Sequence, residues 1–220
     1  MALAACASAP PDYFYTLGGA VAAASGVASG VASAGMALAN APAMPREPFY
    51  IEVPPVDVPQ QVARNQFVVT TGPGRADIIE HRRWLAPLSN EIGSALSADL
   101  SRSLGAIDVY RTPHAATQPV YRINVNVQRF ESVLDSRASL AAVWSVRAVA
   151  SDAVVTCRSD ITVPVGQGYD ALVDGHRSAI AQLSSDIAVT VRHVTASSAP
   201  GAKSAAAMPD AGQMCPAGRS

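Results

Sequence analysis

The chain has 220 residues, of which 49% are hydrophobic and only 15% are charged, and its 16 basic side chains nearly balance its 17 acidic ones. This length supports one domain of ordinary size, and the flat charge pattern lacks the basic stripe expected of a nucleic-acid-binding protein. Residues 18–48 and 196–220 are dominated by Ala, Gly, Ser and Pro, so they offer few large side chains to bury and leave roughly 150 residues for one compact core.

The first feature along the chain is a predicted lipid attachment site. Residues 3–6, Leu-Ala-Ala-Cys, have the form of a bacterial lipobox, in which an apolar and two small residues precede the acceptor cysteine. Only five residues precede Cys6, too few for the basic and apolar regions of an export signal. Either the natural start therefore lies upstream of Met1, or the match is accidental. Ala7 stands where an Asp would favour retention in the inner membrane, and this favours the outer membrane.

A short polar tether leads from Cys6 to a predicted aromatic strand at 13–17, Tyr-Phe-Tyr-Thr-Leu. Even fully extended, about seven residues at ~3.3–3.6 Å each reach only ~25 Å, so a lipid on Cys6 would keep the domain close to a membrane. The uncharged stretch 18–41 is long enough to cross a bilayer but has few large apolar side chains. We interpret it as a flexible loop or frayed helix inserted after the first strand.

The next stretch predicts short strands separated by breakers. Residues 49–53 form a candidate strand, and the prolines that follow keep 56–59 extended. A second strand is predicted over 66–70, a turn at 72–74 (Gly-Pro-Gly), and a short returning strand at 77–80. The basic cluster His81-Arg82-Arg83 is interpreted as a solvated surface feature.

Residues 84–104 are the first strong helix candidate, because leucine and isoleucine recur at three- and four-residue steps. The predicted buried stripe consists of Leu85, Leu88, Ile92, Leu96, and Leu100 or Leu104. Pro87 is tolerated only in the first turn, Gly105 is well placed to end the helix, and a strand is expected at 107–110. Trp84 and the Pro87-Leu88 pair are expected to start the helix and pack it on a sheet.

Three longer strands and a second helix follow. Residues 121–128 alternate strictly between apolar and polar, and strands through 140–146 and 155–163 come after short connections, which favours an antiparallel meander. Trp144 is expected in the core. Gly166-Gln167-Gly168 is interpreted as a turn, before a helix from Tyr169 to about Val194. Two amphipathic helices on one face of a mostly antiparallel sheet predict an α+β, two-layer α/β domain.

The three cysteines have no metal-binding spacing. An odd count in an exported protein suggests that one cysteine serves another purpose than pairing, and Cys6 is the candidate. Cys157 is interpreted as a small core residue and Cys215 as part of a disordered tail. A Cys157–Cys215 bridge in an oxidising compartment is the less favoured alternative.

Clustered catalytic groups are missing from the sequence. Of the four histidines, His176 falls on the apolar stripe of the second helix as a partly buried structural residue, whereas His81, His114 and His193 are predicted in loops or near a helix end, solvated. No nucleophile elbow, His-carboxylate metal motif or glycosidase-like carboxylate pair is present. We therefore predict no enzyme activity, no metal and no cofactor.

Several segments in order resemble a known family. They are L-A-A-C at 3–6, the aromatic strand at 13–17, I-x-V-x-x-V-x-V-P at 51–59, R-x-Q-x-V-V at 64–69, W-x-x-P-L-x-x-x-I at 84–92, Y-x-I-x-V-x-V-x-x-F at 121–130 and L-x-A-x-W-x-V at 140–146. In number and order these motifs resemble the ABC-type transport auxiliary lipoproteins (the PqiC/YmbA-like group), from Cys6 to about Val194 apart from the insertion. The corresponding organisation is a lipobox and tether at 1–12, a domain at 13–195 with the insertion at 18–48, and a disordered tail at 196–220.

The resemblance implies an outer-membrane lipoprotein that faces the periplasm and works with a periplasm-spanning MCE-domain protein in moving lipids between membranes. Its role would be docking or tethering, and the single residue carried over is Cys6 as the lipidation site. A homo-oligomer stays open, and so do the transported substrate and direct binding of lipid in an apolar groove. The alternative is a general periplasmic adaptor, similar in layout to the N-terminal domain of TolB, that binds protein or cell-wall partners.

Overall fold

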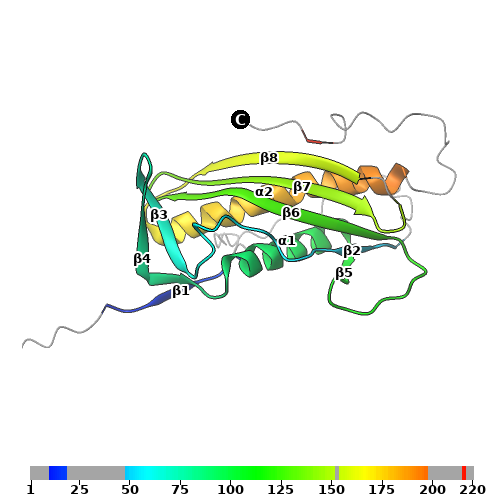
Figure 1. Ribbon diagram of the computed structural model, residues 1–220, viewed down its shortest axis with the longest axis horizontal. Helices are drawn as coiled ribbons and strands as arrows, with labels where there is room; N and C mark the ends of the chain where they lie inside the picture. The colour runs from blue at the N-terminus through cyan, green and yellow to red at the C-terminus, as the bar shows by residue number, and fades with distance from the viewer. Residues whose placement is uncertain (1–9, 19–47, 152–153, 198–214, 217–220) are drawn as a thin grey trace, which may run out of the picture.

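The structure is a computed structural model that describes residues 10–18, 48–151, 154–197 and 215–216. Two long elements, the β6–β8 meander and helix α2, run side by side along its longest axis (Figure 1). In chain order the elements are β1 (Tyr13–Tyr15), β2 (Tyr50–Glu52), β3 (Gln66–Gly72), β4 (Arg75–Trp84), α1 (Leu88–Leu104), β5 (Ile107–Asp108), β6 (Val120–Val133), β7 (Arg137–Ala148), β8 (Val154–Pro164) and α2 (Gly168–Ser197).

The predicted antiparallel meander is confirmed. β6 pairs with β7 from Tyr121↔Ala148 to Val133↔Arg137, and β7 pairs with β8 from Arg137↔Pro164 to Arg147↔Val154. Buried and exposed residues alternate along β8 and along most of β6, as expected where one face is packed and the other is wet. The meander therefore presents one apolar face for the helices to cover.

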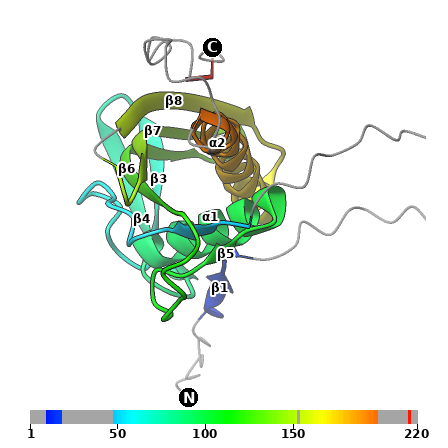
Figure 2. The same ribbon diagram turned by 90° about the vertical axis from the view of Figure 1, so that its right-hand side faces the viewer.

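The α+β class is confirmed, but the expectation of one mostly antiparallel sheet is wrong. The described residues form two mixed sheets, ordered β1-β4-β3 and β5-β2-β6-β7-β8, in which β1–β4, β2–β5 and β2–β6 are parallel pairs. The physical reason is the length of chain that connects the paired strands. Strands joined by tight turns pair antiparallel, whereas a short strand that meets a partner far along the chain is free to lie parallel to it. Viewed along the long axis, β6, β7 and β8 arch over one side, and α1 and α2 close the other (Figure 2).

Helix α1 begins at Leu88, four residues later than predicted. Trp84 ends β4 instead, where its N–H donates to the Asn65 carbonyl at 2.6 Å. Pro87 stands at the N-cap, and Gly105 ends the helix in the left-handed conformation. Both residues therefore mark the ends of the helix, as predicted. Leu85 is not on the buried stripe: it precedes the helix and is 67% exposed.

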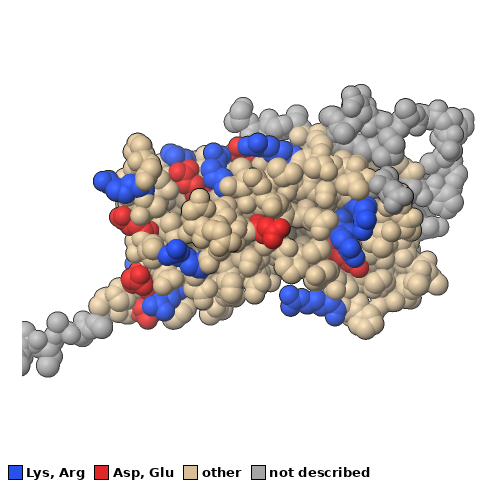
Figure 3. All heavy atoms as spheres, in the orientation of Figure 1, with Lys and Arg blue, Asp and Glu red and all other residues tan. Residues whose placement is uncertain are grey.

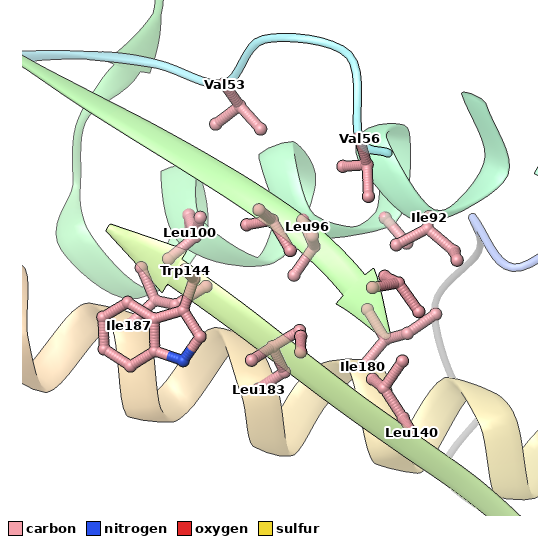
Figure 4. Packing of buried hydrophobic residues seen from close by; sticks show 14 of the residues in the cluster. Val53, Val56, Ile92, Leu96, Leu100, Leu140, Trp144, Ile180, Leu183 and Ile187 are labelled. Carbon is pink, nitrogen blue, oxygen red and sulfur yellow. The ribbon is translucent and has the colours of Figure 1, made fainter. Parts of the chain in front are cut away.

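The core lies between the meander and the two helices (Figure 4). Its largest fully buried side chains include Trp144, and apart from Leu85 the predicted stripes of both helices are buried: Leu88, Ile92, Leu96 and Leu100 on α1, and Val173, His176, Ile180, Leu183 and Ile187 on α2. Gly175 allows α2 to approach β7 closely, because a Cβ there would lie 3.1 Å from Ala138 Cβ and would also collide with the Val165 side chain. Burial of this apolar surface is the main stabilising contribution.

Candidate functional site

The N-terminal segment joins the domain as an edge strand. β1 runs parallel to β4, with Tyr13 opposite Arg82 and Tyr15 opposite Trp84, and the Leu85 N–H donates to the Tyr15 carbonyl at 2.8 Å. Residues 10–12, which precede β1, therefore lie at the end of the molecule that carries β1 and β4 (Figure 1).

A buried carboxyl group holds the residues that follow β1. Glu91, in the first turn of α1, is only 6% exposed. Its Oε2 accepts hydrogen bonds from Thr16 Oγ1 at 2.7 Å and from the Leu17 N–H at 2.8 Å, and its Oε1 accepts one from the Ala86 N–H at 3.1 Å. One side chain thus joins the N-terminal segment, the β4–α1 connection and α1, and it satisfies polar groups that would otherwise be buried without partners.

Two arginines hold the same segment from other elements. Arg177 on α2 donates to the Thr16 carbonyl from Nε at 3.2 Å and Nη2 at 2.7 Å, and its Nη1 pairs with Asp174. Arg82 donates to the Tyr15 hydroxyl at 2.7 Å. We call Glu91, Arg177, Arg82 and the segment Tyr15–Leu17 that they hold the N-terminal clamp.

Arg82 also lies over two aromatic rings, 4.5 Å from the Tyr13 centroid and 4.1 Å from that of Tyr169. The interpretation of the basic cluster as merely solvated is therefore wrong for Arg82, which is half-buried because it stacks and donates. Burial, and then the neighbouring Asp170 carboxylate, raise the pKa of Tyr15 above its ordinary value. The face in Figure 3 shows basic and acidic side chains intermixed at this end.

An aromatic cluster lies beneath the clamp. Tyr15 packs on Phe67, Phe67 on Trp84, and Trp84 meets Phe130 edge-on, with ring centroids 4.2–6.1 Å apart. His176 stacks on Phe130 at 4.0 Å. This cluster joins the small sheet to the meander and α2, so the clamp rests on the main core.

His176 is a structural residue, as predicted, and it is fully rather than partly buried. Its side chain is 1% exposed, Nε2 hydrogen-bonds with Ser132 Oγ at 2.8 Å, and Nδ1 has no hydrogen-bond partner in the described structure. Burial lowers the pKa of this imidazole to about 3, because the charged form would lose its solvation. His176 is therefore neutral at physiological pH.

The less favoured cysteine alternative is the correct one. Cys157 on β8 forms a disulfide with Cys215, 58 residues further along the chain, with the Cα atoms 5.5 Å apart. The preference for two unpaired cysteines fails because spacing along the sequence carries no information about distance in the fold. Cys157 is also buried, which agrees with its predicted core position.

Trp144 is a core residue, as predicted. It is 1% exposed, its Nε1–H donates to Ser159 Oγ at 3.1 Å, and that hydroxyl donates to Asp186 Oδ2 at 2.8 Å. This buried chain of hydrogen bonds links β7, β8 and α2 and satisfies the polar groups that they enclose. It is a structural network, because no other titratable group joins it in the described contacts.

The remaining predicted residues are placed as follows. His81, His114 and His193 are exposed as expected, but His81 lies in β4 rather than in a loop, and its Nδ1 is 3.0 Å from Asp12. Gly168 opens α2 at a positive φ and donates its N–H to Asp135, which confirms a turn. Cys6, and residues 19–47 of the insertion, lie outside the described residues.

Over the ranges that the structure describes, no group of three or more His, Cys, Asp or Glu side chains could hold a metal ion. No helix of the described part is both long and apolar enough to cross a bilayer.

Sequence reasoning missed the clamp, although a signal was present. Glu91 interrupts the apolar face of α1, falling between Leu88 and Ala95 at helical spacing, and a carboxyl group on a buried stripe requires partners. The identity of those partners could not be found from sequence, because Thr16 and Leu17 precede Glu91 by more than 70 residues.

Together these features define a small α+β domain whose segment Tyr15–Leu17 is held by α1, β4 and α2. A sequence profile of the ABC-type transport auxiliary lipoprotein component matches residues 33–188, more than half of the chain, and the chain belongs to this family. The family is one of transport auxiliary components and not of enzymes. No curated protein matches the chain.

Solved structures show the same fold. The crystal structure of an uncharacterized protein is 19% identical, with a TM-score of 0.59 over 84% of this chain and 99% of that one. A Xanthomonas campestris protein of the DUF330 family is 16% identical, with a TM-score of 0.55 over 70% of this chain and 90% of its own. At these identities the likeness concerns the fold alone.

Proposed function

We propose that this chain is an outer-membrane lipoprotein, acylated at Cys6 and facing the periplasm, that tethers an MCE-type lipid transport system. The observation that carries the proposal is the N-terminal clamp. Because Glu91 and Arg177 bind the segment Thr16–Leu17 from two helices, a lipid anchor ten residues upstream would hold the whole folded body. Membership of a transport auxiliary lipoprotein family supports the same role.

The disulfide supports an envelope location independently of the family. Structural disulfides form and persist in oxidising compartments such as the bacterial periplasm and are rare in the cytosol. Cys157–Cys215 uses two of the three cysteines and leaves Cys6 for acylation.

The half of the molecule away from β1 offers a surface for a partner. Ile107 and Val149 are exposed by 65% and 43%. They lie in one row across the sheet, because Ile107 and Val120 pair with Tyr50 from opposite sides and the Val149 N–H donates to the Val120 carbonyl. Exposed apolar side chains that share one surface are typical of protein–protein contacts. A body tethered at one end and docking with the other is the arrangement that a tethering component requires.

The first test is metabolic labelling with a clickable fatty acid. The gene is expressed from its native locus with its upstream DNA, beside a Cys6→Ser variant, and the envelope is separated into inner and outer membranes. We expect a label that depends on Cys6 and sediments with the outer membrane. An unlabelled wild-type protein would refute acylation, and label in the inner membrane would refute the outer-membrane assignment.

The second test concerns the partner. Wild-type protein and an Ile107→Ser/Val149→Ser variant are cross-linked in cells and purified, with Val189→Ser, at an exposed site on α2, as the matched control. We expect an MCE-domain protein to co-purify with wild type and control and to be depleted at least fivefold with the double variant. Recovery of cell-wall or other envelope proteins without any MCE-domain protein would instead favour the general adaptor.

A further inference from the structure

The outer face of the β1–β4 pair carries two large apolar side chains that the core does not use. Phe14 is 60% exposed and Leu85 is 67% exposed. Phe14 lies opposite Arg83 in the parallel pair. The Leu85 N–H donates to the carbonyl of Tyr15, so the side chains of Phe14 and Leu85 are neighbours. We call Phe14, Arg83 and Leu85 the outer patch.

The outer patch and the aromatic cluster occupy opposite faces of the same strands. Tyr15 and Trp84 point inward and pack on Phe67, whereas successive side chains of a strand alternate, so Phe14 and Arg83 point away. Nothing in the described residues covers Phe14 or Leu85, and the adjacent Tyr15 and Trp84 are fixed by their packing in the aromatic cluster on the inner face. The patch is thus a fixed surface and not a frayed terminus.

We propose that the outer patch rests on the phospholipid surface to which the chain is tethered. This inference depends on the proposed anchorage at Cys6. Phe14 follows Cys6 by only eight positions, which at ~3.3–3.6 Å each allows at most ~28 Å between them. The N-terminal clamp begins at the next residue, so the patch cannot move away from the anchor independently of the body.

The chemistry of the patch suits the boundary between lipid headgroups and acyl chains. An aromatic ring and a leucine enter the apolar side of such a boundary, while a guanidinium remains among phosphates. The Arg83 Nε donates to the Glu80 carbonyl at 2.9 Å, which directs the side chain without neutralising it. An exposed Phe and Leu around an arginine therefore favour a phospholipid bilayer as the occupant.

The experiment uses the full chain coupled to vesicles through Cys6. Because Cys157 and Cys215 are bonded to each other, Cys6 is the one thiol available to a maleimide phospholipid. Tryptophan is introduced in the patch by Phe14→Trp, with Ile107→Trp as the matched control, since Ile107 is 65% exposed in the other half of the molecule. The native Trp84 and Trp144 are 4% and 1% exposed, so their emission is a constant background measured on the unsubstituted chain.

With brominated phosphatidylcholine and phosphatidylglycerol in the vesicles, we expect the emission added at position 14 to be quenched at least twofold more than that added at 107. A Leu85→Trp variant should behave like Phe14→Trp. Equal quenching at 14 and 107 would overturn the proposal, and so would protection of position 14 from acrylamide without quenching by bromine, which would indicate a second copy of the chain on the patch.

Chemical coupling supplies the anchor whether or not the cell acylates Cys6. Quenching at position 14 together with a negative fatty-acid label would remove the proposed anchorage and leave the lipid-binding patch standing. A fatty-acid label on Cys6 without quenching at position 14 would leave the proposed anchorage standing and remove the lipid-binding patch.

Discussion

The two ends of the chain are attached to the folded body by different means. The N-terminal segment is held by several hydrogen bonds from α1, β4 and α2, which converge on Tyr15, Thr16 and Leu17. Of the far C-terminal stretch the structure describes Cys215 and Pro216, and Cys215 is bonded covalently to Cys157 on β8. The first attachment consists of several hydrogen bonds and is independent of redox conditions, whereas the disulfide is lost on reduction.

This difference follows what each segment has available. The N-terminal segment has aromatic and β-branched residues that can pair as a strand and bury side chains. The C-terminal stretch 196–220 is rich in Ala, Ser, Gly and Pro and has little to bury, so a covalent link is the effective way to hold one point of it. Three experiments sharpen the comparison, beginning with the largest expected effect.

Replacement of Glu91 tests the N-terminal attachment. Glu91→Ala removes the acceptor of three hydrogen bonds and leaves the buried Leu17 N–H without its partner, so we expect the free energy of unfolding to fall by about 3–4 kcal/mol. Urea denaturation measures the loss in the free energy of unfolding. Faster amide hydrogen exchange at Leu17 would show that the loss arises at the N-terminal segment. Glu91→Gln keeps part of the network and should fall in between.

Asp99→Ala provides the matched control, because Asp99 lies on the same helix and makes only a surface ion pair with Arg102. Its effect should remain below about 1 kcal/mol. If Glu91→Ala cost no more than this control, the clamp would not be the main attachment.

Release of Cys215 tests the C-terminal attachment. In a Cys6→Ser background, Cys215→Ser should lower the free energy of unfolding by about 3 kcal/mol, as is typical when a native disulfide is removed. Adding a reductant should lower the wild-type value by a similar amount and leave Cys215→Ser unchanged. A wild-type protein whose unfolding midpoint is insensitive to reductant would contradict the role assigned to this bond.

Acid affects the core beneath the clamp and leaves the disulfide intact, because His176 titrates and a disulfide does not. The folded pKa of His176 is about 3, below the unfolded value of 6.5, so the unfolded state takes up the proton first. The stability contributed by the neutral imidazole is present above pH 6.5 and is lost as pH falls toward 3. Between pH 7 and pH 5 we expect a loss of about 2 kcal/mol from this residue.

Urea denaturation at the two pH values measures this loss. The double variant Ser132→Ala/His176→Phe removes both hydrogen-bonding partners and should lose most of the dependence, whereas His193→Gln, at an exposed site, should keep it. An unchanged pH dependence in the double variant would assign acid sensitivity to other groups.

Much of the fold could be predicted from periodicity. The alternation at 121–128 predicted β6, and the stripe of Leu88, Ile92, Leu96 and Leu100 predicted the buried face of α1, since each pattern depends only on the local geometry of the element. The family also followed from the order of short motifs and is shown by the profile match. Leu85 was misplaced because the same spacing continues by chance beyond the proline that starts the helix.

The sequence by itself determined most of the strands and helices, most of the residues that form the core, and the family to which the chain belongs. Only the tertiary structure decided that β1 lies parallel to β4, that Glu91 reaches Thr16 and Leu17, and that Cys157 meets Cys215. The reason is physical: periodicity reports on neighbours three or four residues apart, whereas these contacts join residues 58 to 75 positions apart. Their formation depends on how the layers pack and is not encoded in any local pattern.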